Sequence, residues 1–360
     1  MSDPLISLCM IVRDEEDVIE DCLKSAMTVT DEWIVVDTGS TDRTVEKCKS
    51  LGVTVIQHTW MNDFAEARNK GIERATGEWI LWMDADEVLD ATKCDQIRQA
   101  VLQAESDAIF IPVLNFIGES RSHVSPSNAY QLCQIRLFRN GKGIHFSGTI
   151  HEQLNNISSN ALLNPVVLDV VINHYGYLED RVKEKQKNER NLSLLRGQFN
   201  KPEHDPWTEY HIASELNQAG NDQEAFEMLN QSIKRFIKQK QIPPALVYKL
   251  KYDILIRNGS IKGIWPGIEK AIQLYPDYVD LHFYKGLFFL SQERIHEAIG
   301  VFEHCIQLGE KNWRYLILRG VGSFLAMEAL AQCMESLEKL PEAAVDRELG
   351  SVGLSSDHDR

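Results

Sequence analysis

Residues 79–87, WILWMDADE, are the stretch that decides the fold of this 360-residue chain. The apolar residues predict a buried strand, and two carboxylates, Asp84 and Asp86, follow at its end. Open α/β sheets bind ligands at the carboxyl ends of their strands. Carboxylates one residue apart, around the small Ala85, can reach a single divalent cation through oxygen ligands. The stretch therefore predicts an enzyme that handles a metal-bound diphosphate.

Strand and helix patterns alternate in the residues before this stretch. Strands are expected at residues 5–12, 33–36 and 53–56, and helices at 18–26 and 63–75. This βαβ alternation predicts an α/β fold with a mostly parallel sheet and helices on both faces. After Asp107, further strands are expected at residues 108–113, 132–138 and 166–173. They could extend the sheet and add a small antiparallel part that closes over a site.

From about residue 180 the pattern is helical and contains an internal repeat. KAIQLYP around Gln273 aligns with HCIQLGE around Gln307, an offset of 34 residues, which is the period of tetratricopeptide (TPR) repeats. Stacked units of this kind often bind peptides or partner chains, and helical packing without a ligand is the alternative. We expect a catalytic domain at 1–178, a linking helix at 179–204, all-α TPR-like repeats at 205–340 and a C-terminal tail at 341–360.

The amino-acid composition argues against some kinds of binding partner and some cellular locations. The net charge of −15 argues against a nucleic-acid backbone as a general partner. The seven cysteines are scattered and form no C-x-x-C pair, which favours a reducing cytoplasm over a disulfide framework or a zinc site. No apolar run approaches the ~20 residues of a membrane span. A cytoplasmic protein without a transmembrane segment is therefore expected.

Further polar residues fall near the sheet edge that carries Asp84 and Asp86. Asp37 ends the second expected strand, where it could accept hydrogen bonds from a base or ribose, or could only cap the turn that follows. Arg68 and Asn69 lie on the helix before residues 79–87. The apolar face of that helix would bring Arg68 near the sheet edge, and a surface ion pair is the alternative.

Several segments resemble the successive motifs of family 2 glycosyltransferases with the GT-A fold, over roughly residues 5–177. They are SLCMIVRDEEDVIEDCLKSA, EWIVVDTGSTDRTVE and WMNDFAEARNKGIERATGEWILWMDADE. More narrowly, WMNDFAEARN, RLFRNGKGIHFSGTIHEQL and INHYGY, followed by helical repeats, resemble the subgroup of sublancin-type S-glycosyltransferases and lipopolysaccharide-core glucosyltransferase-like proteins. The chain departs from the usual pattern at Arg13-Asp14, where many members carry a small residue or Asn before Glu.

The resemblance implies where a nucleotide-sugar donor would bind. Asp37 would contact uracil or ribose, Arg68 would support the base and diphosphate, Asp84 would lie near the ribose, and Asp86 would hold Mg²⁺ or Mn²⁺ on the diphosphate. The implied donor-binding residues are Val12, Arg13, Glu15, Asp37, Arg68, Asn69, Asp84, Ala85 and Arg136. The implied metal ligands are Asp86, Asp84 and His174, although a histidine at a strand end could also be structural.

An inverting transfer also needs a base that takes the acceptor proton. The resemblance places an acidic residue after the D-x-D region, and Glu152, in His151-Glu152, is the candidate. A carboxylate is a suitable general base once the acceptor is within hydrogen-bond reach. His151 could instead be the base, or could orient Glu152.

Together these features predict a metal-dependent, inverting hexosyltransferase of bacterial type. Its donor would be a UDP-sugar, with UDP-glucose as first candidate, and its acceptor a Cys or Ser/Thr side chain of a peptide or protein. The same chemistry on a cell-envelope glycan or lipid-linked acceptor is the alternative. A repeat-based binding protein with an inactive transferase domain and a nucleotidyltransferase are weaker alternatives. The family resemblance also suggests a homodimer.

Overall fold

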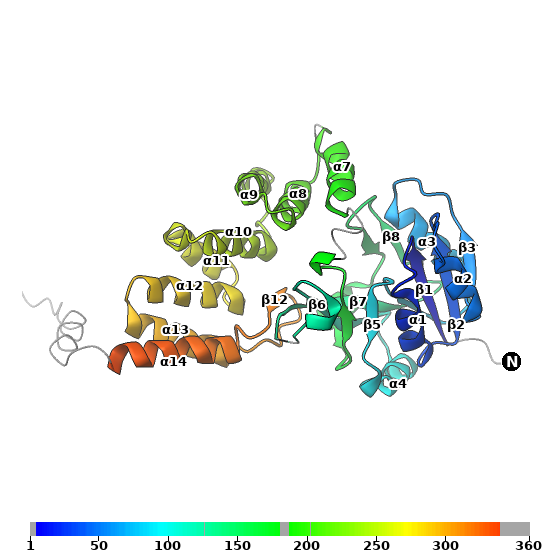
Figure 1. The fold of residues 1–360 in the computed structure, drawn as a ribbon, viewed down its shortest axis with the longest axis horizontal. Helices are drawn as coiled ribbons and strands as arrows, with labels where there is room; N and C mark the ends of the chain where they lie inside the picture. Colours follow the sequence, from blue (N-terminus) through cyan, green and yellow to red (C-terminus); the bar gives the residue numbers. More distant parts are fainter. Residues whose placement is uncertain (1–4, 126, 181–186, 202, 339–360) are drawn as a thin grey trace, which may run out of the picture. The chain divides into compact units, whose positions relative to one another are not determined.

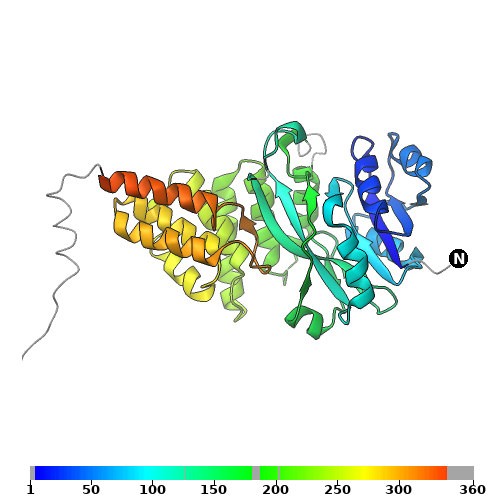
Figure 2. The same ribbon diagram turned by 90° about the horizontal axis from the view of Figure 1, so that it is seen from below.

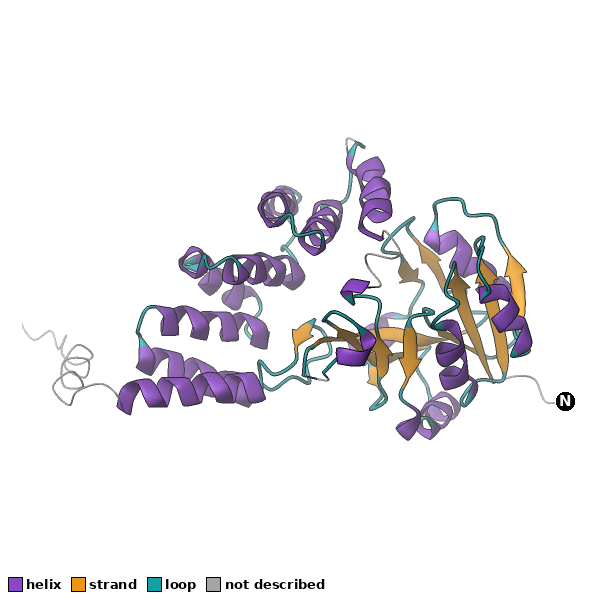
Figure 3. Cartoon of the chain, in the orientation of Figure 1, coloured by secondary structure: helices purple, strands orange, loops and turns teal. Residues whose placement is uncertain are grey.

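The computed structural model describes residues 5–125, 127–180, 187–201 and 203–338. Contacts within the chain divide it into two compact units, one of residues 1–243 and 313–318 and one of residues 244–312 and 319–360. The strands belong to the first unit, and the second is helical (Figure 3). The expected tail at 341–360 and part of the expected linking helix, residues 181–186, lie outside the described residues.

Figure 1 labels many of the elements of the first unit. Its strands are β1 (Ile6–Val12), β2 (Glu32–Asp37), β3 (Thr54–Gln57), β4 (Trp79–Trp82), β5 (Glu87–Leu89), β6 (Ala108–Phe116), β7 (Ala129–Arg139), β8 (His145–Ser147), β9 (Gln153–Asn155), β10 (Val166–Val167), β11 (Ile172–His174) and β12 (Ile317–Leu318). Its helices are α1 (Ile19–Met27), α2 (Thr44–Ser50), α3 (Phe64–Arg74), α4 (Asp95–Gln103), α5 (Ser159–Leu163), α7 (Lys187–Phe199), α8 (Trp207–Gln218) and α9 (Asp222–Lys238).

The main sheet has the order β3-β2-β1-β4-β7-β6-β11-β5, with β10 beside β6 and β12 beside β7. β3, β2, β1 and β4 are parallel, which confirms the parallel sheet predicted for the first part of the chain. β7 is antiparallel to both of its neighbours, β4 and β6. A separate antiparallel pair, β8 and β9, supplies the small antiparallel part that was expected after the first half.

Apolar side chains on both sides of the central strands explain why helices cover both faces of the sheet. On one face Leu8 and Met10 share a core with α1, α2 and α4. On the other face Cys9 and Ile80 share a core with α3 and β8. Since successive strand residues point to opposite faces, a strand that is buried on both sides needs a continuous apolar run. The run beginning at Trp79 meets that need, because Trp79, Ile80 and Leu81 are all fully buried. Figure 2 shows the strands of this sheet, coloured from blue to green, with helices of similar colours beside them.

The prediction of one continuous strand at residues 166–173 is wrong, because this range contains two separate strands, β10 and β11. β10 and β11 both run beside β6, where Val167 pairs with Phe110 and Ile172 pairs with Val113. From Val167 to Ile172 the chain advances by five residues, whereas the facing part of β6, from Phe110 to Val113, advances by three residues. The segment between β10 and β11 therefore leaves the sheet. β11 also pairs antiparallel with β5, so the end of β11 lies beside the beginning of β5.

The second unit consists of helix pairs. Its elements are α10 (Ala245–Arg257), a 3-10 helix (Ile261–Ile264), α11 (Gly267–Leu274), α12 (Val279–Ser291), α13 (Ile295–Leu308) and α14 (Phe324–Glu338). The repeated sequence Gln-Leu ends both α11 and α13, as expected for equivalent second helices. α12 and α13 pack closely at Gly286, where a Cβ would stand 2.5 Å from the Phe302 ring. Among the described residues, no helix combines the length and apolar character needed to cross a membrane.

The observed units differ from the expected domain boundaries. α7, α8 and α9 group with the sheet, although residues 179–204 were assigned to a linker and residues from 205 onward to the repeats. Two contacts join α7 and α8 to the loop between β8 and β9. Gln198 of α7 donates a hydrogen bond to Thr149, and His211 of α8 stacks on His151. The domain boundaries stay a prediction, but the first helices after the sheet help to build its pocket.

Candidate active site

A cavity of about 550 Å³ opens where β1, β2 and β4 end, and all of its lining residues belong to the first unit. Loops that follow these parallel strands meet there, as expected for a ligand site in an open α/β sheet. Ten of the thirteen predicted site residues line the cavity: Val12, Arg13, Glu15, Arg68, Asp84, Ala85, Asp86, His151, Glu152 and His174. Asp37, Asn69 and Arg136 lie outside the lining.

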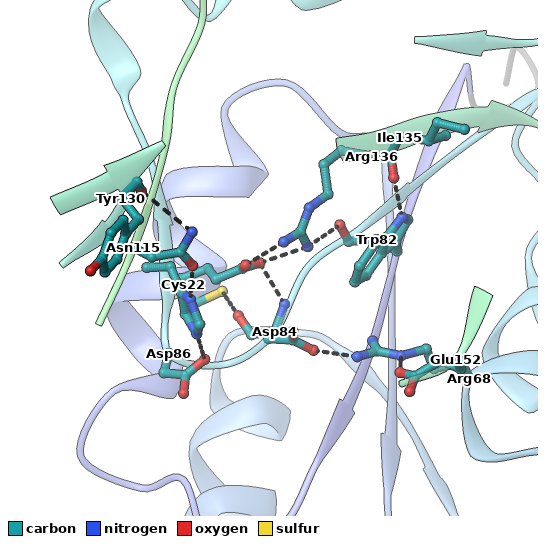
Figure 4. A network of polar contacts seen from close by, with 12 residues as sticks. Cys22, Arg68, Trp82, Asp84, Asp86, Asn115, Tyr130, Ile135, Arg136 and Glu152 are labelled. Atoms are coloured by element: carbon teal, nitrogen blue, oxygen red, sulfur yellow. Dashed lines mark hydrogen bonds and ion pairs between the residues drawn. The ribbon is translucent and has the colours of Figure 1, made fainter. Parts of the chain in front are cut away.

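Arg136 holds the turn that carries two of the three predicted metal ligands, Asp84 and Asp86. Its guanidinium donates to both carboxylate oxygens of Glu87, at 2.5 and 2.9 Å. Glu87 in turn accepts a hydrogen bond from the backbone N–H of Asp84 at 2.8 Å. Both side chains of the ion pair are buried, and the guanidinium also lies over the Trp82 ring (Figure 4). Arg136 therefore acts on the turn after β4 through Glu87.

Arg68 joins the D-x-D turn to the segment of the candidate base. Its Nη2 donates to Asp84 at 2.7 Å and its Nε donates to Glu152 at 2.5 Å (Figure 4). The guanidinium packs against both the Trp82 and the Phe146 rings, 4.7 and 5.4 Å from their centroids. A planar, permanently charged group suits such a buried two-sided bridge.

The charge of Arg68 also sets the ionisation of its neighbour. Burial by itself would raise the pKa of Asp84, but the guanidinium groups of Arg68 and Arg136 lower it below its usual value. Asp84 therefore stays ionised in its half-buried place at the cavity wall.

Asp37 and Asn69, two residues predicted to contact the donor, make hydrogen bonds to backbone groups of the protein. Asp37 is buried and accepts hydrogen bonds from the backbone N–H groups of Gly39 and Ser40, so it caps the turn after β2. Asn69 exchanges two hydrogen bonds with the backbone of Phe146, which fixes β8 against α3. Both residues position loops near the cavity.

The Arg13-Asp14 departure from the family pattern has a structural role. Asp14 has a positive φ of 53°, a conformation that Asp tolerates better than most residues. Its carboxylate accepts hydrogen bonds from the backbone and hydroxyl of Thr41, and its backbone N–H donates to Ser40. The loop after β1 is thereby tied to the loop after β2, and Arg13, Asp14 and Glu15 all line the cavity.

The residues around Asp86 fit a divalent cation. His174 Nε2 lies 3.4 Å from Asp86 Oδ1, and both side chains are largely buried. A Cβ on Gly176 would stand 2.5 Å from His174 Nε2 and closer still to Asp86 Oδ2, so only glycine leaves this space open. Within the described ranges, no cluster of three or more His, Cys, Asp or Glu side chains forms a complete metal site. Mg²⁺ bound to a nucleotide commonly takes one or two protein carboxylates and completes its shell with phosphates and water.

The charged side chains that line the cavity also favour a divalent cation there. Its carboxylates belong to Asp14, Glu15, Asp84, Asp86, Glu152 and Glu215, and its guanidinium groups to Arg13, Arg68 and Arg190. Like charges repel more strongly in a partly enclosed site than in water. A nucleoside diphosphate would therefore meet net repulsion unless a cation lay between its phosphates and the carboxylates.

The sequence motifs did not predict the part of the cavity wall that α7 and α8 supply. It consists of Arg190 and Asn191 of α7 and Ser214, Glu215 and Gln218 of α8. Asn191 donates a hydrogen bond to Glu215 at 2.9 Å, which links the two helices. His211, Glu215 and Gln218 recur at helical spacing on one side of α8, but polar residues at that spacing also occur on solvated helix faces. The sequence therefore offered only a weak signal for this wall.

The chain is similar to several known proteins. The family model of glycosyl transferase family 2 matches residues 7–163. The SPbeta prophage-derived glycosyltransferase SunS of Bacillus subtilis is 31% identical over 294 residues, covering 80% of this chain and 67% of SunS. A TPR repeat-containing protein of Synechococcus elongatus is 32% identical over 282 residues, covering 74% of this chain and 66% of that protein. The chain thus spans about two thirds of the length of these relatives.

Among solved structures, S. aureus TarS 1-349 is 18% identical and covers 72% of this chain and 88% of its own, with a TM-score of 0.37. The match to SunS extends over most of the chain and the family model covers the sheet that builds the cavity. The chain belongs to glycosyl transferase family 2.

Proposed function

We propose that the chain transfers a hexose from a UDP-sugar to a Cys or Ser/Thr side chain of a peptide or protein, with inversion at the anomeric carbon. UDP-glucose is the first donor to test. The observation that carries the proposal is the Arg68 bridge, since one guanidinium contacts both Asp84 and Glu152. A donor-side carboxylate and a carboxylate that can serve as base are thereby held at a fixed separation across one cavity.

Asp86 and His174 are the proposed protein ligands of Mg²⁺ or Mn²⁺, with Asp84 beside them on the ribose side. When bound, the cation offsets the negative charge that develops on the departing UDP. Glu87 and Arg136 keep the turn in place because they hold the Asp84 backbone. The net acidic lining makes donor binding depend on the cation.

Glu152 is the proposed general base. Arg68 bonds to its Oε1, and among the described residues no hydrogen bond reaches its Oε2. Oε2 can therefore accept the acceptor proton while Oε1 stays anchored. His151 is the second candidate, because it also lines the cavity, but its ring is stacked against His211. A thiol acceptor would need a weaker base than an alcohol acceptor, because a thiol loses its proton more readily.

The donor half of the proposal is tested by calorimetry and by donor hydrolysis. UDP should bind in the presence of Mn²⁺ and lose most of its affinity when EDTA is added. Slow release of glucose from UDP-glucose should be measurable, and Asp86→Asn should abolish it. If UDP binds neither with nor without metal, the proposed donor is wrong.

The acceptor half is tested separately by mass spectrometry after incubation with UDP-glucose and candidate peptides that contain Cys, Ser or Thr. A hexose increment on the peptide supports the proposal. An increment only on an envelope glycan or lipid-linked sugar contradicts the peptide acceptor and leaves the donor chemistry intact.

A further inference from the structure

Strand register places Asn115 directly beside His174. In the parallel pair β6–β11 His174 is the register partner of Asn115, and in the antiparallel pair β6–β7 Asn115 is the register partner of Tyr130. On its other side, in the pair β11–β5, His174 is the register partner of Glu87. The histidine is therefore held in the sheet between the asparagine and the strand that follows the D-x-D turn.

The hydrogen bonds of Asn115 determine which end of its amide faces the histidine. Its Nδ2 donates to the backbone carbonyl of Tyr130 at 3.4 Å, so its Oδ1 faces His174. Oδ1 lies 2.7 Å from His174 Nδ1 (Figure 4). Because an amide oxygen can only accept, Nδ1 must carry the proton in this contact. Nε2, which faces Asp86, is then the nitrogen with the lone pair in the neutral ring.

We infer that Asn115 is a positioning residue for the metal site. It selects the His174 tautomer and ring orientation that present Nε2 toward the space beside Asp86 and Gly176. A histidine ligand generally needs such a partner on its other nitrogen, and loss of the partner commonly weakens metal binding by about 10–100-fold. The inference rests on the proposed function, since that proposal makes His174 a ligand.

The test compares Asn115→Leu, which removes the acceptor, with Asn115→Asp, which keeps an acceptor oxygen. Asn128→Leu is the matched control, because Asn128 is an exposed residue at the turn of the same β6–β7 hairpin, where its side chain donates to the backbone of Ile117 and not to His174. Mn²⁺ binding is measured by electron paramagnetic resonance in the presence of UDP. Asn115→Leu should weaken Mn²⁺ binding by about 10–100-fold, whereas Asn115→Asp and Asn128→Leu should stay close to the wild type. If Asn115→Leu does not fold, Asn115→Ala takes its place.

A second measurement needs no metal. In protein with ¹⁵N-labelled histidine, the ring nitrogen shifts report which nitrogen of His174 carries the proton. The wild type and Asn115→Asp should show His174 protonated at Nδ1, and Asn115→Leu should lose that preference. An unchanged tautomer together with unchanged Mn²⁺ affinity in Asn115→Leu would overturn the inference and leave the proposed function standing. Absence of Mn²⁺ binding in the wild type would overturn the proposed metal dependence and, with it, the inference.

Discussion

The imidazole rings of His151 and His211 stack with their centroids 3.7 Å apart and their planes 10° apart. His151 lies in the loop before β9 and His211 lies in α8, so the stack ties the segment of the candidate base to a helix. Burial lowers the pKa of His211 well below its usual value, and the nearby His151 lowers it further. The fold therefore favours the neutral imidazole at position 211.

This pKa direction predicts a loss of stability in mild acid. Between the ordinary histidine pKa of 6.5 and the lower folded value, the unfolded chain binds a proton that the folded chain does not. The free energy of unfolding should thus be highest above pH 6.5 and fall as the pH drops below it, by up to about 1.4 kcal/mol per pH unit for one group. Urea denaturation between pH 7.5 and 5.5 measures this. His211→Phe should reduce the slope, and His145→Gln, at an exposed position, should not; equal slopes in all three proteins would contradict the assignment.

Gly176→Ala should block the proposed cation site. The new methyl group would occupy the space beside His174 Nε2 and Asp86 Oδ2, so the affinity for Mn²⁺ and UDP should fall at least about tenfold, which corresponds to about 1.4 kcal/mol. Calorimetry measures the loss. Gly197→Ala is the control, because a Cβ on this α7 residue meets nothing within 4 Å. Equal affinities for the two variants would rule out a cation at this place.

Glu152→Gln and His151→Gln distinguish the two candidate bases. Gln at position 152 keeps an oxygen for Arg68 but cannot take a proton, so the transfer rate should fall by about 10²–10⁴-fold. The affinity for Mn²⁺ and UDP should stay within a few-fold of the wild type, because the change is on the acceptor side. His151→Gln should have the smaller effect on the transfer rate. The opposite ranking in single-turnover kinetics would identify His151 as the base.

Arg136→Met should destabilise the sheet strongly. It would leave Glu87 buried without its charged partner, and removal of one member of a buried ion pair costs about 3–5 kcal/mol. The free energy of unfolding from urea titration measures the cost. Arg43→Met breaks the exposed pair of Arg43 with Glu16 and should leave the free energy nearly unchanged. A small effect of Arg136→Met would show that the turn after β4 does not depend on this pair.

Local patterns were sufficient for much of the fold. β1, β2, β3 and β4 lie close to where the sequence predicted them. For β1, β2 and β4 the reason is that a largely buried strand needs apolar residues at consecutive positions, whereas β3 is a partly exposed edge strand. The helix expected at 63–75 is α3, and it begins after Asp63, whose carboxylate accepts a hydrogen bond from the N–H of Glu66. The single strand expected at 166–173 failed, because the register against β6 leaves two residues over. Register depends on how two strands pair, so the sequence of one strand alone does not predict it.

By itself, the sequence determined which groups gather at the sheet edge. Asp84, Asp86 and Arg68 were predicted from the strand and helix patterns around them, and the resemblance to the family motifs added Glu152 and His174. All five line one cavity. Only the tertiary structure decided what their neighbours do. Asp37, Asn69 and Arg136 make hydrogen bonds that hold segments near the cavity. α8 lines the cavity and Asn115 contacts His174, both across large sequence separations. The reason is that a polar side chain bonds whichever partner packing brings within about 3 Å, and that partner is set by strand register and helix docking.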